Sequence, residues 1–166
     1  LSSIFSVGHS STGVLYQTGG TLASAQLLGV PRAYDSSDYL NGNGTATFAG
    51  GTAEIAGIRL ADRPLSTGEV NLNGTAVVTT PWLYRSYPNF SQGYKGDGSQ
   101  TMLTNYVDGV MVFTTKAYLN FNGGTLRAAD NSEANLLGAG YNRPDRTTVF
   151  AGGAQFDTNG RDVTVS

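Results

Sequence analysis

The 166-residue chain contains no cysteine and a single histidine. Without thiols it has no disulfide staples, no thiolate metal sites and no cysteine nucleophile. Charged residues make up 13% of the sequence, about half the usual share, and the net charge of -2 comes without a cluster of Lys or Arg. We therefore expect no nucleic-acid partner, because such proteins carry a concentrated basic surface. No apolar run approaches the roughly 18 residues of a membrane-spanning helix, so we expect no membrane span in this segment.

A helical pattern is also lacking. No window of about 11 residues places apolar side chains at helical spacing, whereas glycine, with 23 residues, is about twice as frequent as in an average protein. Frequent glycine favours many turns that join short strands, which predicts an all-β fold. The chain opens with Leu1-Ser2-Ser3 and ends inside the alternating pattern of Asp162 to Ser166. We therefore expect a mature piece or an excerpt of a longer protein.

A short strand that runs into a Gly-Gly or Asn-Gly turn and out into a second strand recurs five times. One such unit cannot cover its own apolar face, so the units must stack on one another. Stacking in register, about 4.8 Å apart, predicts a parallel β-helix, and parallel crossovers are almost always right-handed. The structural glycines of the turns are Gly19, Gly20, Gly50, Gly51, Gly74, Gly123, Gly124, Gly152 and Gly153.

The last glycines of the five turns follow one another at spacings of 31, 23, 50 and 29 residues. We interpret the spacing of 50 as two coils with an insertion, which predicts about six coils in a single solenoid segment, 1–166. An antiparallel sandwich with a hairpin at every Gly-Gly is the structural alternative, but it does not explain a coil-length period. Alternation predicts one side of each strand to point inward. The apolar pairs of this pattern are Val14 and Tyr16, Ala46 and Phe48, Val70 and Leu72, and Leu119 and Phe121.

The repeats also carry a likeness to a known family. Residues 122–130 read NGGTLRAAD and residues 150–165 read FAGGAQFDTNGRDVTV. The stretch 117–166 that contains them resembles the passenger repeats of autotransporter proteins, which are large exported bacterial surface proteins. The first half, with 16–22 and 48–53, is similar to the divergent repeats of very long exported proteins. The resemblance implies a right-handed β-helical stalk on the surface of a Gram-negative-type bacterium, often used for adhesion or spacing.

The repeat breaks between Thr80 and Lys116, so the family's function is not carried over to that part. We predict an irregular insertion at 81–113, which holds seven of the 17 aromatic residues and the only Trp. Aromatic rings on a loop can stack on sugars or anchor a protein partner. The interpretation we favour is that they cover the side of the solenoid as a small satellite core. The candidate binding surface consists of Trp82, Tyr84, Arg85, Tyr87, Phe90 and Tyr94.

Catalytic and metal chemistry find little support. His9 lies among serines but has no neighbouring carboxylate or oxyanion hole to complete a catalytic triad. Asp157 follows a Gly-Gly like the aspartate of a calcium-binding nonapeptide, but Gln155 replaces the third glycine. We therefore predict no catalytic residue, no cofactor and no metal ion.

The leading hypothesis is a non-catalytic structural segment of a bacterial cell-surface or extracellular protein that acts as a stalk, an adhesin or a self-associating fibre. Self-association would use the open ends of the solenoid, where strands lack neighbours. One alternative is a glycan- or surface-binding module built on 81–113. Another is a polysaccharide-active β-helix enzyme, which requires carboxylates clustered on one face of the solenoid. The carboxylates considered for this role are Asp35, Asp38, Asp97 and Asp108.

Overall fold

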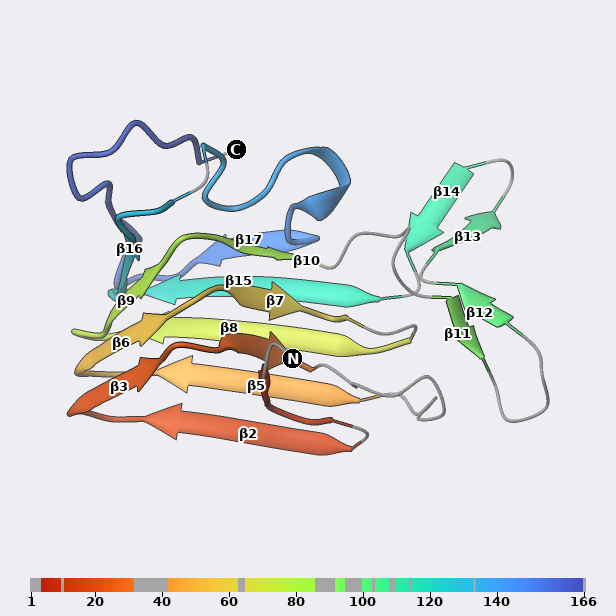
Figure 1. The fold of residues 1–166 in the computed structure, drawn as a ribbon, viewed down its shortest axis with the longest axis horizontal. Helices are drawn as coiled ribbons and strands as arrows, with labels where there is room; N and C mark the ends of the chain where they lie inside the picture. Colours follow the sequence, from red (N-terminus) through yellow and green to blue (C-terminus); the bar gives the residue numbers. More distant parts are fainter. Residues whose placement is uncertain are drawn as a thin grey trace.

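The computed structural model is all-β, with parallel sheets stacked as in a β-helix or solenoid (Figure 1). The predicted stacking of coils is therefore confirmed, and the sandwich of hairpins at the Gly-Gly turns is not formed. Within 92–113 the structure describes the backbone alone. The structure describes residues 4–9, 11–31, 42–62, 65–85, 92–94, 100–102, 104–107, 110–113, 115–132 and 134–165.

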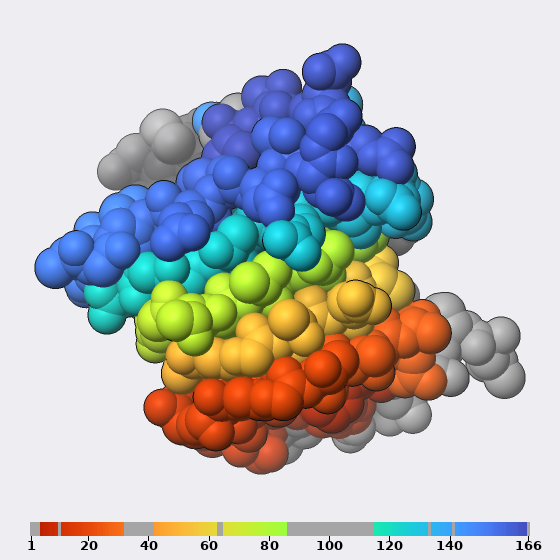
Figure 2. Space-filling view, turned by 90° about the vertical axis from the view of Figure 1, so that its left-hand side faces the viewer, coloured from red at the N-terminus to blue at the C-terminus, as the bar shows by residue number. Residues whose placement is uncertain are grey.

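Each coil contributes one strand to each of up to three parallel sheets. The first sheet contains β2 (Thr12–Gln17), β5 (Asn43–Phe48), β8 (Thr67–Asn73), β15 (Lys116–Asn122) and β17 (Arg146–Val149). The second contains β3 (Thr21–Ser24), β6 (Thr52–Ile55), β9 (Val77–Thr80), β16 (Thr125–Ala128) and β18 (Gln155–Asp157). The third contains β1 (Ile4–Ser6), β4 (Leu27–Val30), β7 (Ile58–Leu60) and β10 (Leu83–Arg85). A short 3₁₀ helix, η2 (Gly140–Asn142), follows the fourth coil. Figure 2 shows the coils lying over one another in sequence order.

The register of the first sheet defines the length of each coil. Thr12 pairs with Asn43, and Asn43 pairs with Thr67. Thr67 then pairs directly with Lys116, so the interpretation of the 50-residue spacing as two coils is wrong. It is one coil interrupted by an extra segment. The expected count of about six coils is not confirmed, because the first and second sheets have five described strands each.

The extra segment carries two antiparallel strand pairs beside the solenoid, at the right of Figure 1. The pairs are β11 (Gln92–Tyr94) with β12 (Gln100–Met102), and β13 (Thr104–Val107) with β14 (Val110–Phe113). The first residues of the predicted 81–113 insertion belong to the solenoid itself, because β10 pairs with β7 in the third sheet. Among the described residues, no helix is long and apolar enough to cross a membrane.

The core is a set of apolar columns that run through successive coils. Phe48, Leu72 and Phe121 occupy equivalent positions, and all three are fully buried. Full burial of one such side chain contributes roughly 1.5–3 kcal/mol, and neighbouring coils supply the contacts. The remaining predicted inward residues of these coils, Ala46, Val70 and Leu119, are also fully buried. The inward alternation is therefore confirmed for three of the four pairs.

The first coil differs from that prediction. Val14 and Tyr16 are 71% and 64% exposed, because the pairing places Leu15 beside Ala46 and Gln17 beside Phe48. A shift of one residue turns every side chain of a strand to the other face. The inward interpretation of Val14 and Tyr16 is therefore wrong.

The turns stack as closely as the strands. The N–H of Thr52 donates to the carbonyl oxygen of Gly20 in the coil before, at 2.9 Å. A Cβ added at Gly51 would lie 2.2 Å from that same oxygen. Positive φ angles recur at the turn glycines Gly20, Gly51, Gly74, Gly123 and Gly153.

The last coil leaves its inward positions open. Val149 follows Phe121 in its column, and Phe156 follows Leu126. They remain 56% and 40% exposed, although the Phe156 ring lies 5.0 Å from that of Phe121. This end of the described solenoid is thus partly apolar.

Candidate functional site

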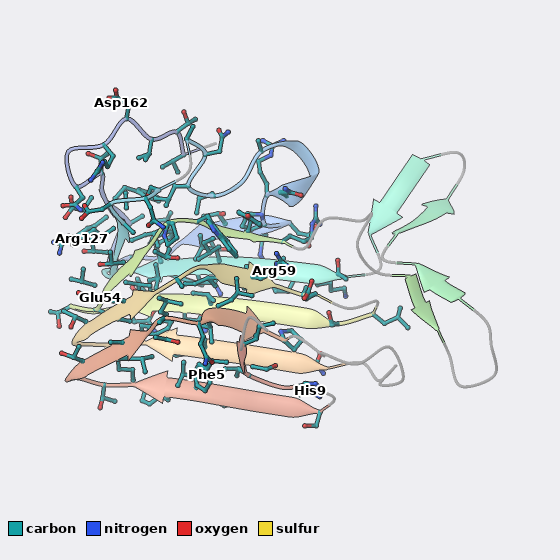
Figure 3. All side chains as sticks on the ribbon, in the orientation of Figure 1. Phe5, His9, Glu54, Arg59, Arg127 and Asp162 are labelled. Atoms are coloured by element: carbon teal, nitrogen blue, oxygen red, sulfur yellow. The ribbon has the colours of Figure 1, made fainter. Side chains whose placement is uncertain are left out.

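The outward face of the second sheet brings together polar side chains that are far apart in the sequence. The pairing of the strands stacks Ala23, Glu54, Thr79, Arg127 and Asp157 in one column, one residue from each coil. Figure 3 shows Glu54 and Arg127 at the same side of the solenoid. Thr79, the small side chain between these two, leaves space between the carboxylate and the guanidinium groups.

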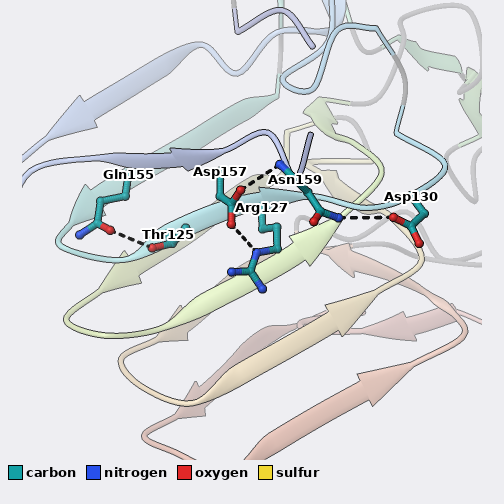
Figure 4. Close-up of polar contacts among 6 residues, drawn as sticks. All are labelled: Thr125, Arg127, Asp130, Gln155, Asp157 and Asn159. Atoms are coloured by element: carbon teal, nitrogen blue, oxygen red, sulfur yellow. Dashed lines mark hydrogen bonds and ion pairs between the residues drawn. The ribbon is translucent and has the colours of Figure 1, made fainter. Parts of the chain in front are cut away.

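Arg127 and Asp157 form the central ion pair of this face. The Arg127 Nε donates to a carboxylate oxygen of Asp157 at 2.6 Å, and the backbone N–H of Asn159 donates to the other oxygen at 2.8 Å (Figure 4). The Asn159 N–H and then the Arg127 side chain lower the pKa of Asp157 below its ordinary value of 3.8. Asp157 is therefore held ionised, with its orientation fixed by both donors.

A second carboxylate is held beside the first. Asp130 accepts hydrogen bonds from Arg161, at 2.9 Å, and from the side-chain amide of Asn159, at 3.4 Å. Asn159 has a positive φ of 53°, a conformation that asparagine tolerates better than most residues. Its backbone thus binds Asp157 while its side chain reaches Asp130, so one turn residue connects the two ion pairs.

These side chains form the rim of a groove of about 550 Å³. Its apolar lining includes the residues that turn the corner from the second to the third side of the first four coils, Ala25, Ala56, Pro81 and Ala129. The polar residues around it include Glu54, Thr79, Arg127, Asp130, Asn131 and Asn159. This volume lies within the range of small-molecule sites.

Of the predicted aromatic surface, Trp82 and Tyr84 are described and partly buried. Their rings stack at 4.3 Å, and the Arg59 guanidinium lies 5.9 Å from the Trp82 ring. Trp82 covers Gly57 so closely that a Cβ added there would lie 2.3 Å from the indole. The pair therefore packs along the solenoid side, and its use in binding stays a prediction. Tyr87, Phe90 and the side chain of Tyr94 lie outside the described part of the chain.

Arg85 is buried, with only 6% of its side chain exposed. It forms an ion pair with Asp145, whose other oxygen accepts the N–H of Ala117 at 2.7 Å. Burial lowers the pKa of Arg85, and Asp145 opposes that shift. Asp145 thus connects the end of β10 with the start of β15. The extra segment leaves the solenoid after β10 and returns at β15, so the Arg85–Asp145 ion pair holds these two points together.

The other carboxylates considered for catalysis, Asp35, Asp38, Asp97 and Asp108, lie outside the described residues. Where side chains are described, no group of three or more His, Asp or Glu could hold a metal ion. The groove was not predicted from the sequence. The sequence does contain one indication that these residues share a face. Glu54 and Arg127 each lie three residues after the last glycine of their turns.

Comparison of the chain with known protein families, curated proteins and solved structures finds no match in any of the three.

Proposed function

We propose that this chain is a non-catalytic structural segment of a bacterial cell-surface or extracellular protein. In this proposal it is a right-handed β-helix that serves as a stalk, an adhesin or a self-associating fibre. The observation that carries it is the continuous column of core residues, such as Phe48, Leu72 and Phe121, which ties each coil to the next. A stack of this kind keeps one cross-section along its axis and lengthens by adding coils.

The hand follows from the rule that parallel crossovers are right-handed in nearly all cases. The surface location and the relationship to autotransporter passengers rest on the resemblance of 122–130 and 150–165 to the repeats of that family.

Brief protease treatment of intact source cells tests the location. We expect peptides of this chain to be released into the medium while a cytoplasmic enzyme stays uncut. Recovery of the chain only after lysis would overturn the surface assignment.

Self-association has its own structural support in the last coil. Val149 and Phe156 continue two core columns but remain half exposed. At the other end of the described stack, β2 and β3 are the edge strands of their sheets. A second copy placed with β2 over β17 and β3 over β18 would cover the apolar end and continue both sheets. Such a contact joins unlike surfaces, so it repeats without closing and produces a filament.

Sedimentation velocity of the isolated chain over a range of concentrations tests this contact. We expect association in the unmodified chain and a monomer after Phe156→Lys, which places a charge at the stacking surface. Val14→Lys is the matched control, because Val14 is 71% exposed but faces outward on β2. A monomeric unmodified chain, or equal effects of both substitutions, would refute end-to-end stacking.

A further inference from the structure

The groove beside the second sheet owes its shape to four small corner residues. Ala25, Ala56, Pro81 and Ala129 directly follow β3, β6, β9 and β16, and all four line the groove. Because successive coils rise by about 4.8 Å, the four corners span roughly 14 Å along the solenoid axis. The result is an elongated floor of small residues that crosses four coils, with Ala25 and Ala56 exposed, Ala129 partly buried and Pro81 buried.

Ionic groups at the rim largely cancel one another. Arg127 is paired with Asp157, and Asp130 is paired with Arg161. Glu54 is the remaining charged residue of the lining. A polyanion would meet uncompensated negative charge here, and a polycation would find one unpaired carboxylate. The balance favours a ligand without net charge.

Several hydrogen-bonding groups of the rim are unused within the described part of the chain. Glu54 and Asn131 have no hydrogen-bond partner there, and Arg127 uses its Nε on Asp157 but neither of its Nη groups. In Figure 4 the Arg127 guanidinium lies over β9, toward the lower coils. Carboxylate acceptors, guanidinium donors and amides together match hydroxyl groups, which both donate and accept.

We infer that this groove binds a neutral glycan chain that lies along the solenoid axis. The apolar faces of the sugar rings pack on the alanines of the floor, while their hydroxyls bond to Glu54, Arg127 and Asn131. Glu54 and Arg127 are separated by two coil steps, roughly 10 Å. A chain of several sugars reaches both groups together, whereas a single sugar does not. This binding activity goes beyond the structural role, and it uses a different face from Trp82 and Tyr84.

Calorimetric titration of the whole chain with defined sugars tests the inference. The probes are the neutral tetrasaccharides of glucose, mannose and N-acetylglucosamine, each beside its monosaccharide. Heparin serves as a polyanion and polylysine as a polycation. We expect saturable binding of at least one tetrasaccharide, with its monosaccharide at least tenfold weaker and neither charged polymer competing.

Two substitutions on one strand separate the groove from the rest of the face. Thr79→Tyr fills the space between Glu54 and Arg127, whereas Val77→Tyr adds the same ring two residues away on the same outward face, outside the lining. We expect Thr79→Tyr to abolish binding and Val77→Tyr to leave it within about twofold. Glu54→Gln keeps the shape and is expected to weaken binding about tenfold, because a hydrogen bond to a charged group is lost.

Circular dichroism and the urea midpoint of each variant identify those that fail to fold, and Glu54→Gln supplies an answer if Thr79→Tyr is among them. Absence of tetrasaccharide binding would overturn the inference. So would equal binding by Thr79→Tyr and Val77→Tyr, an unaffected Glu54→Gln variant, or preferred binding of heparin or polylysine. None of these results bears on the proposed role as a stalk or fibre, which is tested by location and self-association.

Discussion

Coil-on-coil stacking of the turns can be tested with two glycines that share one backbone conformation. Gly20 and Gly51 occupy equivalent positions in consecutive turns, with φ angles of +69° and +77°. An alanine in this left-handed region costs roughly 1–2 kcal/mol at either site. At Gly20 the new methyl group meets nothing within 4 Å, whereas at Gly51 it would lie 2.2 Å from the Gly20 oxygen and 2.6 Å from the Gly19 carbonyl carbon.

The contacts at Gly51 are with backbone atoms, so the two coils must move apart to make room for the methyl group. Overpacking of this kind adds about 1–3 kcal/mol. We expect Gly20→Ala to lower the free energy of unfolding by about 1–2 kcal/mol and Gly51→Ala by about 2–5 kcal/mol. Urea unfolding monitored by circular dichroism measures both losses.

Amide hydrogen exchange at Thr52, which donates to Gly20, reports the same turn locally. We expect faster exchange there in Gly51→Ala than in Gly20→Ala. Equal losses of stability, together with equal exchange at Thr52, would show that the turns do not lie directly over one another.

Other consequences of the structure can be measured on the same chain. Asp145→Ala removes the carboxylate that forms an ion pair with buried Arg85 and is expected to cost about 1.5–3 kcal/mol in urea unfolding, whereas Asp162→Ala, at an exposed position, should change little. An unaltered midpoint for Asp145→Ala would contradict the fastening role of the pair. Because the folded-state pKa of Asp157 is lowered, its contribution to stability is complete above its unfolded pKa of about 3.8 and is lost as pH falls through the lower folded value. The stability gap between the unmodified chain and Asp157→Asn should therefore be complete above about pH 4 and should close as the pH falls below that, and a gap independent of pH would refute this linkage.

The repeat was accessible from sequence because turn glycines and inward residues obey strong local rules. Gly51 needs positive φ, and Phe48 and Phe121 are apolar at positions that point inward. The first coil was mispredicted because apolar residues lie on both faces of β2, where Val14 and Leu15 are adjacent. Alternation alone does not choose between these faces, whereas the pairing of Leu15 with Ala46 and of Gln17 with Phe48 does.

The groove was missed for a different reason. Glu54, Arg127 and Asp157 come from three coils, so their proximity depends on the register between coils rather than on any local pattern. The 50-residue spacing hid that register, because nothing in the sequence says whether extra length is another coil or a detour. The direct pairing of Thr67 with Lys116 identifies it as a detour.

That detour leaves and rejoins the solenoid at the corner between the third and first sheets. The connection from Val30 to Asn43 uses the same corner, and in both places the strands on either side keep their pairing. The length of the chain inserted at this corner therefore does not change the register between the strands of the solenoid. An epitope or a small domain grafted there would be displayed without refolding the host, and natural relatives are expected to differ in loop length at that corner and in side-chain identity elsewhere.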